Sequence, residues 1–422
     1  MIQSGLYARL AERGLLCRHE ETDHPPFDAG NSLRVIEPEP VPFVSYPYEW
    51  CFGELKDAAL VTLAIQRQAL QFGMSLKDAS AYNIQFVGSK PVLIDSLSFE
   101  MYDEGKPWIA YRQFCQHFLA PLALMSRRDI RLGQLLRVHI DGLPLELASR
   151  LLPRRTWLDA GLLIHLHLHA QAQSRLTGRR LPSRGRMSRE AMDELILSLQ
   201  RTIQRLTWRP HGTPWADYEL RKSYSGAAAE DKRGLVAEWV SRIRPSTIWD
   251  LGANAGVYSR IALEAGARMV VAFDLDPAAV ERNYLQTRAT HGERLLPLVL
   301  DLTNPSPALG WAHRERESFI ARGPADLILA LALVHHLAIA NNLPLEMIGA
   351  LLASVGRWHI IEFVPKSDSR VQQLLVSRQD IFPEYSPDGF EAALRKRFTV
   401  HARVQLTESD RQLYLLESLA AA

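Results

Sequence analysis

The chain has 422 residues, 47% of them hydrophobic and 23% charged, with a formal net charge of +2. This length and composition are typical of a globular protein of two or more domains with a large core. Because the net charge is small, no whole-protein field favours nucleic acid, and we expect no nucleic-acid partner.

The cysteines and the N-terminus bear on where the protein is found. Cys17, Cys51 and Cys115 are far apart and odd in number, which suggests a reducing compartment and shows no metal-ligand spacing. The opening stretch MIQSGLYARLAERG lacks the apolar core of a signal peptide, and no apolar run approaches membrane-spanning length. We therefore expect a cytoplasmic protein with no membrane partner.

The first 170 residues predict an α+β domain that is largely helical. Proline-rich loops fill most of residues 1–45, and the apolar period of residues 52–72 predicts a helix that ends at Gly73. Residues 74–95 then predict a loop followed by a hairpin that turns at Gly88.

This hairpin carries three polar residues whose spacing has several interpretations. Asp78 and Asn83 are spaced D-x-x-x-x-N, and Asp95 ends the second strand. The pattern resembles protein-kinase-like phosphotransferases, which implies that the first Asp orients an acceptor hydroxyl and the other two residues hold magnesium. The sequence shows no glycine-rich phosphate loop and no V-A-I-K lysine, and Ser96 replaces the expected Phe-Gly. We rank a degenerate kinase-like scaffold first, a hairpin whose acids cap turns second, and an active kinase third.

The helical remainder of this domain contains a run of histidines. His165 and His169 are four residues apart and share a helix face, a spacing that a metal can use, with His167 between them. No third ligand is evident, so we interpret these histidines as buried or interfacial and expect no metal.

Residues 171–224 predict a basic linker and a helical lid. Six arginines and no acid lie between positions 175 and 189, where glycine and proline break any helix. A solvated loop is favoured over a basic arm for an anionic partner. An aromatic, turn-rich stretch that includes Tyr218 and Tyr224 follows.

The most informative stretch is residues 247–276. A short apolar strand ends at Asp250, a turn of small residues follows, and an amphipathic helix ends at Gly266. A second apolar strand then ends at Asp274. This order predicts half of a doubly wound α/β sheet with a ligand crevice at the strand ends.

The turn between these strands indicates the class of cofactor. Gly252, Asn254 and Gly256 take the place of the G-x-G-x-x-G of a dinucleotide site. The carboxylate of Asp250 would repel a pyrophosphate but suits an ammonium group, and Asp274 is placed to accept both hydroxyls of a ribose. S-adenosylmethionine has an ammonium, a sulfonium and no phosphate, so these residues favour it. The alternative is a turn that binds no ligand.

The run D-x-G-x-N-x-G followed by F-D-L-D-P resembles the first two motifs of class I S-adenosylmethionine-dependent methyltransferases. The resemblance implies that Asp301 lies beside the adenine, and we assign Leu275 and Leu302 to the same cofactor site. It also implies that Tyr218 and Tyr224 are lid contacts over the cofactor, unless they form an apolar patch between domains.

The catalytic candidates follow the fourth and fifth strands of the predicted sheet. His335 and His336 stand in the L-x-H-H-L that small-molecule methyltransferases often carry after the fourth strand, and Glu362 lies near the end of the fifth. A histidine titrates in a range suited to removing a proton from a hydroxyl or ammonium acceptor, while Glu362 would pair with a cationic group. We expect one histidine to be structural and the other functional.

A wider resemblance covers nearly the whole chain. The segments YPYEW, LKDASAYNIQF, LIDSLSFE and IIEFVPKSD, together with the glycine turn, resemble bacterial two-part methyltransferases of the nodulation-protein type. We therefore expect an α/β protein with an N-terminal α+β domain (1–170), a linker and lid (171–224) and a Rossmann-like, seven-stranded methyltransferase domain (225–422).

The expected function is methylation of oxygen or nitrogen on a small molecule that is a natural product, a sugar or amino-acid-like. The N-terminal domain would then shape the acceptor site. One alternative is a cofactor-binding module whose kinase-like half recruits a protein partner. The other is a bifunctional kinase and methyltransferase.

Overall fold

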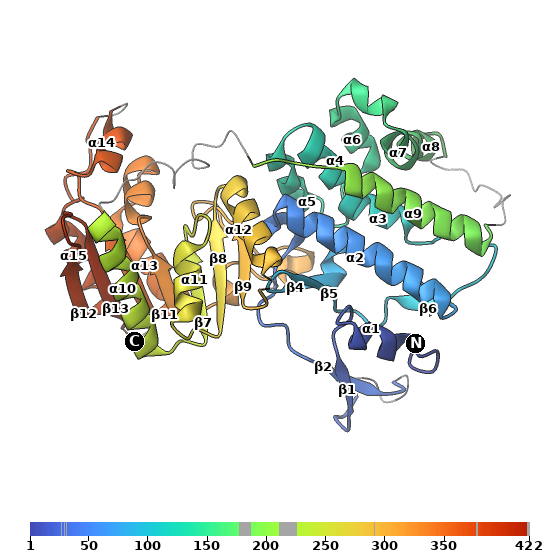
Figure 1. Ribbon diagram of the computed structural model, residues 1–422, viewed down its shortest axis with the longest axis horizontal. Helices are drawn as coiled ribbons and strands as arrows, with labels where there is room; N and C mark the ends of the chain where they lie inside the picture. The colour runs from blue at the N-terminus through green and yellow to red at the C-terminus, as the bar shows by residue number, and fades with distance from the viewer. Residues whose placement is uncertain are drawn as a thin grey trace. The chain divides into compact units, whose positions relative to one another are not determined.

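The computed structural model describes residues 1–26, 28, 30, 32–176, 187–210, 226–290, 292–376 and 379–419, with the backbone alone for 173–176. The chain divides into two compact units, Met1–Arg209 and Pro210–Ala422 (Figure 1). Helix 189–205 belongs to the first unit, so this unit extends past the expected boundary at residue 170. Among the described residues, no helix has the length and hydropathy needed to cross a bilayer.

The first unit is mainly helical, as the sequence predicts. Its helices and helical turns are α1 (Leu6–Glu12), η1 (Pro47–Glu49), α2 (Phe52–Gln71), η2 (Ala81–Asn83), α3 (Tyr111–Phe114), η3 (Cys115–Leu119), α4 (Ala120–Arg127), η4 (Ile130–Gln134), α5 (Leu135–Val138), α6 (Leu145–Leu151), η5 (Arg154–Leu158), α7 (Ala160–Leu162), η6 (Leu163–Leu168), α8 (His169–Leu176) and α9 (Arg189–Arg205). Its strands are β1 (His19–Thr22), β2 (Val35–Pro38), β3 (Met74–Leu76), β4 (Ile84–Val87), β5 (Lys90–Leu93) and β6 (Phe99–Met101).

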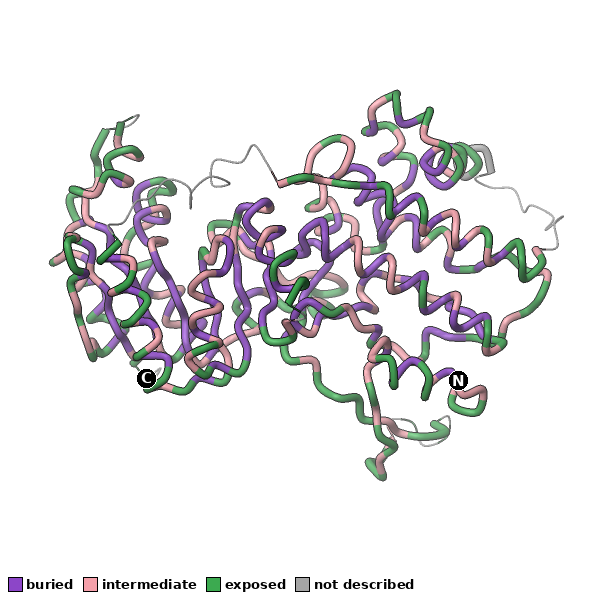
Figure 2. The backbone as a smooth tube through the Cα atoms, viewed as in Figure 1, coloured by how far each residue is buried: buried purple, intermediate pink, exposed green. Residues whose placement is uncertain are grey.

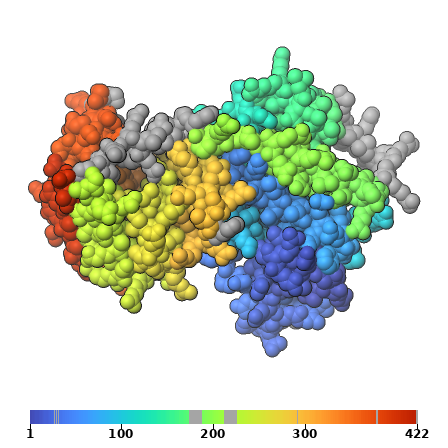
Figure 3. All heavy atoms as spheres, viewed as in Figure 1, coloured from blue at the N-terminus to red at the C-terminus, as the bar shows by residue number. Residues whose placement is uncertain are grey.

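Helices α2 and α9 form the long pair of the first unit and lie side by side on its surface (Figure 3). Arg67 donates to Asp193 through Nε at 2.8 Å and Nη2 at 3.3 Å. Lys56 Nζ donates to the last carbonyls of α9 and its cap, at 3.0 Å to Gln204 and 2.8 Å to Leu206. A cation at the C-terminal end of a helix also interacts favourably with the helix dipole. These contacts explain why α9 folds with the first unit.

Two histidines of the run, His165 and His167, are buried, as expected, and His169 is half-buried. His165 Nδ1 lies 2.9 Å from Tyr111 Oη, and its Nε2 lies 2.9 Å from Ser198 Oγ. His167 is also buried, and its pKa, like that of His165, is lowered by burial. The structure therefore places these two imidazoles in the core as neutral hydrogen-bonding groups.

The second unit contains a seven-stranded sheet with the order β12-β13-β11-β10-β7-β8-β9. Strands β11, β10, β7, β8 and β9 are parallel, and β13 pairs antiparallel with both β11 and β12. The strands are β7 (Thr247–Leu251), β8 (Met269–Asp274), β9 (Leu295–Val299), β10 (Ala325–Ala330), β11 (Gly356–Phe363), β12 (Phe398–Gln405) and β13 (Gln412–Ser418). The helices and helical turns are α10 (Gly226–Ile243), α11 (Val257–Glu264), α12 (Pro277–Ala289), η7 (Trp311–His313), η8 (Ile320–Arg322), η9 (His336–Ala340), α13 (Leu345–Val355), α14 (Ser369–Leu375) and α15 (Pro387–Leu394).

Both faces of this sheet are covered, so its central strands are buried along their length (Figure 2). Strands with two buried faces are expected to be continuously apolar, as β7, β8 and β10 are. Ile248, Val270 and Leu329 lie in one core with side chains of α10 and α11. Trp249 and Phe273, which alternate with these residues, contact Phe319 at ring-centroid distances of 5.0 and 5.5 Å. The predicted strands are thus all present.

Two carboxylates join separate segments of this unit through hydrogen bonds. Asp326, at the start of β10, accepts hydrogen bonds from the backbone amides of Ser246 at 2.8 Å and Thr247 at 2.9 Å. Asp231, near the start of α10, accepts from the amide and the hydroxyl of Thr407, both at 2.9 Å. The second contact ties α10 to the connection between β12 and β13.

Candidate functional site

The turn after β7 has a backbone conformation that requires small residues. Gly252, Asn254 and Gly256 all have positive φ, of 78°, 50° and 79°. A side chain at Gly256 would meet the Asn283 side chain at 2.5 Å, so only glycine fits there. The amide of Asn254 donates to Asp274 Oδ2 at 2.7 Å, which joins the turn to the end of β8.

A cavity of about 370 Å³ lies at the carboxyl ends of β7, β8, β9 and β10. This is where ligands bind in open parallel sheets. Seven of the residues proposed from the sequence line it, namely Gly252, Asn254, Asp274, Leu275, Asp301, Leu302 and His336. The other lining residues are Phe273, Leu300, Thr303, Leu331, Ala332, Leu333, Leu337, Ala340 and Asn341.

Asp274 is the acid in the cavity wall whose two carboxylate oxygens each accept a backbone amide. Besides the bond from Asn254, its Oδ1 accepts from the amide of Asp276 at 2.8 Å. Burial raises the pKa of Asp274 to about 6, although both backbone hydrogen bonds oppose the shift. Each carboxylate oxygen keeps a further lone pair, so this group can accept from two donors of a bound molecule.

Asp250 has a different position from Asp274. It is buried, it does not line the cavity, and its Oδ2 accepts from Ser259 Oγ of α11 at 2.6 Å. Burial raises the pKa of Asp250 to about 6, while Ser259 and the charge of Lys232 oppose the rise. Its observed contact therefore holds the start of α11 against β7, and contact with a cofactor stays a prediction.

Asp301 and Thr303, which follow β9, also line the cavity. Asp301 Oδ1 accepts from the amide of Thr303 at 2.8 Å and from its hydroxyl at 2.6 Å. Sequence reasoning missed Thr303. Thr303 lies two residues after Asp301, an aspartate at a strand end, and this spacing is typical of an Asx turn. The spacing could therefore have identified Thr303 as a residue of the site.

The two histidines occupy different environments. His336 lines the cavity, and burial, followed by the charge of Arg370, lowers its pKa to about 4. His335 is fully buried, and neither of its ring nitrogens has a hydrogen-bond partner within the described part of the chain. Burial, His336 and three nearby cations hold the pKa of His335 well below its usual value. The two ring centroids lie 4.1 Å apart, and His336 is the one of the two that lines the cavity.

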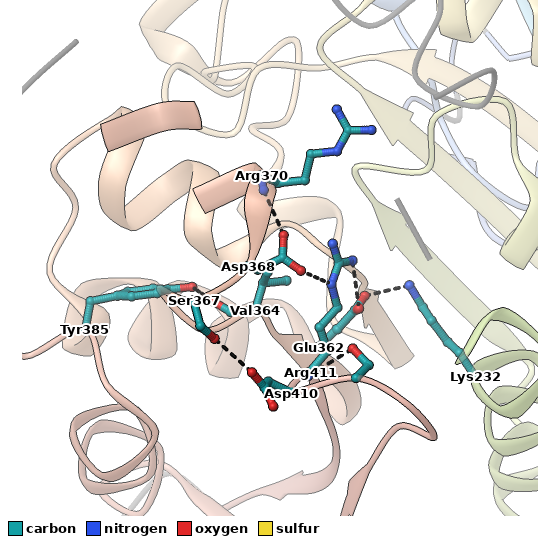
Figure 4. Close-up of polar contacts among 10 residues, drawn as sticks. Lys232, Glu362, Val364, Ser367, Asp368, Arg370, Tyr385, Asp410 and Arg411 are labelled. Atoms are coloured by element: carbon teal, nitrogen blue, oxygen red, sulfur yellow. Dashed lines mark hydrogen bonds and ion pairs between the residues drawn. The ribbon is translucent and has the colours of Figure 1, made fainter. Parts of the chain in front are cut away.

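Glu362 does not line the cavity, contrary to what its place near a strand end suggested. It is fully buried and lies between two cations, with Oε2 2.5 Å from Lys232 Nζ and Oε1 3.3 Å from Arg411 Nη1 (Figure 4). Arg411 also contacts Asp368 at 2.7 Å through Nε. The side chain turns toward these cations because a buried carboxylate is stable only when it is paired. We call these four residues the buried ion cluster.

Two of the proposed cofactor residues, Tyr218 and Tyr224, lie outside the described residues.

In the first unit, Asn83 Nδ2 donates to Ser98 Oγ at 3.0 Å, and Ser98 Oγ donates to Asp95 Oδ2 at 2.6 Å. Asp78 Oδ1 accepts from the amide of Ser80 at 2.9 Å. These contacts are those expected of turn-capping acids, and the kinase-like interpretation stays a prediction.

The strand order, the single antiparallel strand β13 between β11 and β12, and the glycine turn joined to a strand-end aspartate define the class I S-adenosylmethionine-dependent methyltransferase fold. No protein-family model matches the chain. The chain is 39% identical over 394 residues to nodulation protein NoeA of Rhizobium meliloti (strain 1021), covering 92% of this chain and 83% of that protein. The chain belongs to the NoeA family, which confirms the nodulation-protein resemblance.

Other similarities are confined to part of the chain. Ribosomal protein L11 methyltransferase of Herpetosiphon aurantiacus is 30% identical over 104 residues, which cover 23% of this chain and 32% of that protein. A magnesium protoporphyrin IX methyltransferase (ChlM) structure from Synechocystis PCC 6803 with bound SAH matches at 16% identity, covering 50% of this chain and 90% of that chain, with a TM-score of 0.34. N-methyltransferase NodS from Bradyrhizobium japonicum WM9 matches at 11% identity, covering 46% and 98%, with a TM-score of 0.33. Because these scores are low, the fold assignment depends on the strand order, the antiparallel strand β13 and the glycine turn, and not on these structures.

Proposed function

We propose that this protein binds S-adenosylmethionine in the second unit and transfers its methyl group to oxygen or nitrogen of a small-molecule acceptor. The acceptor class we favour is a natural product, a sugar or an amino-acid-like molecule. The observation that carries the proposal is Asp274, which is held by two backbone amides in the wall of the 370 Å³ cavity with acceptor capacity to spare. A carboxylate there suits ribose hydroxyls and disfavours a dinucleotide pyrophosphate.

The residues present fit this cofactor. Gly252 lines the cavity, and an added side chain would lie 3.3 Å from Leu333, so the glycine keeps the cavity open on that side. Asp301 and Leu302 would contact the adenine, and Asp274 the ribose. When bound, the cofactor supplies a methyl group that its sulfonium has already activated.

The protein then has to align the acceptor, exclude water and accept one proton. His336, which lines the cavity, is our candidate for that last role. Its pKa of about 4 keeps it neutral near pH 7 and also makes it a weaker base than an ordinary histidine. The apolar residues around it, Leu333 and Leu337 among them, limit the access of water. One functional and one structural histidine therefore stays a prediction.

Calorimetric titration of the full chain with S-adenosylmethionine, and separately with ATP and magnesium, tests the proposal. Binding of S-adenosylmethionine alone supports a methyltransferase. Binding of ATP as well would revive the bifunctional alternative, and binding of neither would contradict the cofactor assignment. A protein that binds the cofactor but transfers no methyl group to any small-molecule fraction would favour the binding-module alternative.

Replacing His336 by glutamine should lower kcat by about 100-fold or more without changing the affinity for S-adenosylmethionine, since proton transfer typically contributes a factor of this size. Initial rates of S-adenosylhomocysteine formation, with any acceptor that the wild type methylates, measure kcat. His359→Gln is the matched control, because His359 is a buried histidine of the same unit that bonds to Gly356 O and Ser418 Oγ. Equal losses in the two variants would remove His336 from the mechanism.

Affinity for S-adenosylmethionine should fall as the pH is lowered through about 6. The free protein holds the pKa of Asp274 near 6, and the ribose hydroxyls bind its ionised form. Below pH 6 the cofactor must therefore displace a proton, and affinity should fall by about tenfold per pH unit, whereas it should be constant above pH 7. Calorimetry from pH 5 to 8 measures this slope, which the Asp274→Asn variant should lack. A flat profile in the wild type would contradict the ribose assignment.

A further inference from the structure

The connection between α6 and α7 presents apolar side chains to solvent. The turn η5 has the sequence Arg-Arg-Thr-Trp-Leu, and all of its residues except Thr156 are exposed. Leu158 is 90% exposed and Trp157 is 37% exposed, and Leu151, at the end of α6, is 38% exposed. Exposed apolar side chains that occur singly are common, whereas here two adjacent ones in η5 follow a third at the end of α6.

This turn is held rigidly from the inside. Thr156 Oγ1 donates to Pro153 O at 2.6 Å and lies 2.9 Å from Nε2 of His167. The Trp157 ring stacks on His167 with a centroid distance of 4.4 Å and an interplanar angle of 13°. Asp159 then caps α7 by accepting from two amides, at 3.0 and 3.2 Å. The exposure of Leu158 is therefore a fixed property of the fold.

The sequence around these apolar side chains carries an excess of arginine, although Arg127, Arg131 and Arg150 are paired with acids. Arg154 and Arg155 belong to the same turn, are exposed, and have no ion-pair partner in the described ranges of the chain. Between residues 127 and 159 the sequence holds seven arginines and four acidic residues, which gives this segment a net charge of +3. A rigid turn that combines leucine, tryptophan and exposed arginines suits a lipid bilayer surface. Such a surface has an apolar interior below negatively charged head groups.

We infer that η5 docks the first unit on an anionic membrane surface. Leu158 would enter the acyl boundary, Trp157 would lie at the head-group level, and Arg154 and Arg155 would contact lipid phosphates. A protein partner fits less well, because a stable protein interface needs about 800 Å² on each side, and a single protruding turn offers much less. The inference revises the expectation of no membrane partner and is independent of the proposed methyl transfer.

Co-sedimentation of the full chain with vesicles of phosphatidylcholine and phosphatidylglycerol at 70:30 tests the inference. We expect an association constant on the order of 10⁴ M⁻¹ or weaker, comparable to that of one acyl anchor, and no binding to pure phosphatidylcholine. Leu158→Asp and the double variant Arg154→Glu/Arg155→Glu should each weaken binding by about tenfold. Tryptophan fluorescence should shift to shorter wavelength on binding in the wild type.

Matched controls separate the turn from general effects of charge and exposure. Leu33→Asp changes a leucine of the first unit that is 94% exposed, and Arg9→Glu/Arg18→Glu makes the same charge change at exposed positions remote in sequence. Both should bind vesicles within twofold of the wild type. Equal losses in controls and turn variants, or no binding of the wild type to anionic vesicles, would overturn the inference. Binding to polyglutamate that needs the arginines but not Leu158 would instead indicate an acidic protein partner.

Discussion

Replacing Asp274 by alanine should weaken S-adenosylmethionine binding by about 100-fold or more. The substitution removes both ribose acceptors, and each hydrogen bond to a charged group contributes about 1.5–3 kcal/mol. It also frees the Asn254 amide, which donates to Asp274 at 2.7 Å, so the glycine turn keeps only its backbone bonds to Phe273 of β8. Isothermal titration calorimetry at pH 7.5 measures the change.

Asp326→Ala is the matched control for this experiment. Asp326 also accepts two backbone amide bonds in the same sheet, but it lies at the start of β10 and not in the cavity wall. We expect it to lower stability as much as Asp274→Ala does and to leave cofactor affinity unchanged. Native affinity in the Asp274→Ala protein would show that the ribose assignment is wrong.

Replacing Glu362 by alanine should destabilise the second unit by about 3–5 kcal/mol. The substitution leaves Lys232 and Arg411 buried with one carboxylate fewer, and breaking a buried ion pair from one side has a cost of about this size. In a unit of this size the loss corresponds to a melting temperature lower by roughly 10 °C. Differential scanning calorimetry of the full chain measures the shift.

The surface pair Glu346 and Lys396 provides the comparison. Its side chains are 63% and 58% exposed, so Glu346→Ala should leave the melting temperature unchanged within error. The pair of variants also decides what Glu362 does. If Glu362→Ala keeps the native melting temperature but loses methyl transfer, the residue acts in catalysis as the sequence suggested, and the buried ion cluster has no structural role.

The cofactor side of the site could be predicted because its residues are close in sequence. Residues 247–276 contain a strand, a turn that needs glycine and a second strand, and the chemistry of each position is local. His336 could be proposed because it follows a strand end. The orientation of Glu362 could not, since its partners, Lys232 and Arg411, are 130 and 49 residues away and come from other elements.

The extent of the first unit likewise depends partly on local patterns and partly on contacts between residues that are distant in the sequence. The helical period of residues 52–72 predicted α2 correctly, because amphipathicity is a local pattern. Helix α9 was assigned to a linker and lid because an arginine-rich stretch precedes it. Its membership of the first unit depends on Arg67 and Lys56, two positions on α2 whose partners no local pattern reveals.

The buried ion cluster also restricts the order in which the second unit can be completed. Lys232 comes from its first helix, Glu362 from β11, and Arg411 immediately precedes the last strand. During synthesis the carboxylate of Glu362 can meet Lys232 early, but Arg411 leaves the ribosome only with the final strand. The buried ion cluster therefore cannot become neutral until Arg411, which follows β12, has been made. A chain that stops before residue 411 would leave Asp368 without this cation, which makes the hairpin of β12 and β13 essential to the unit.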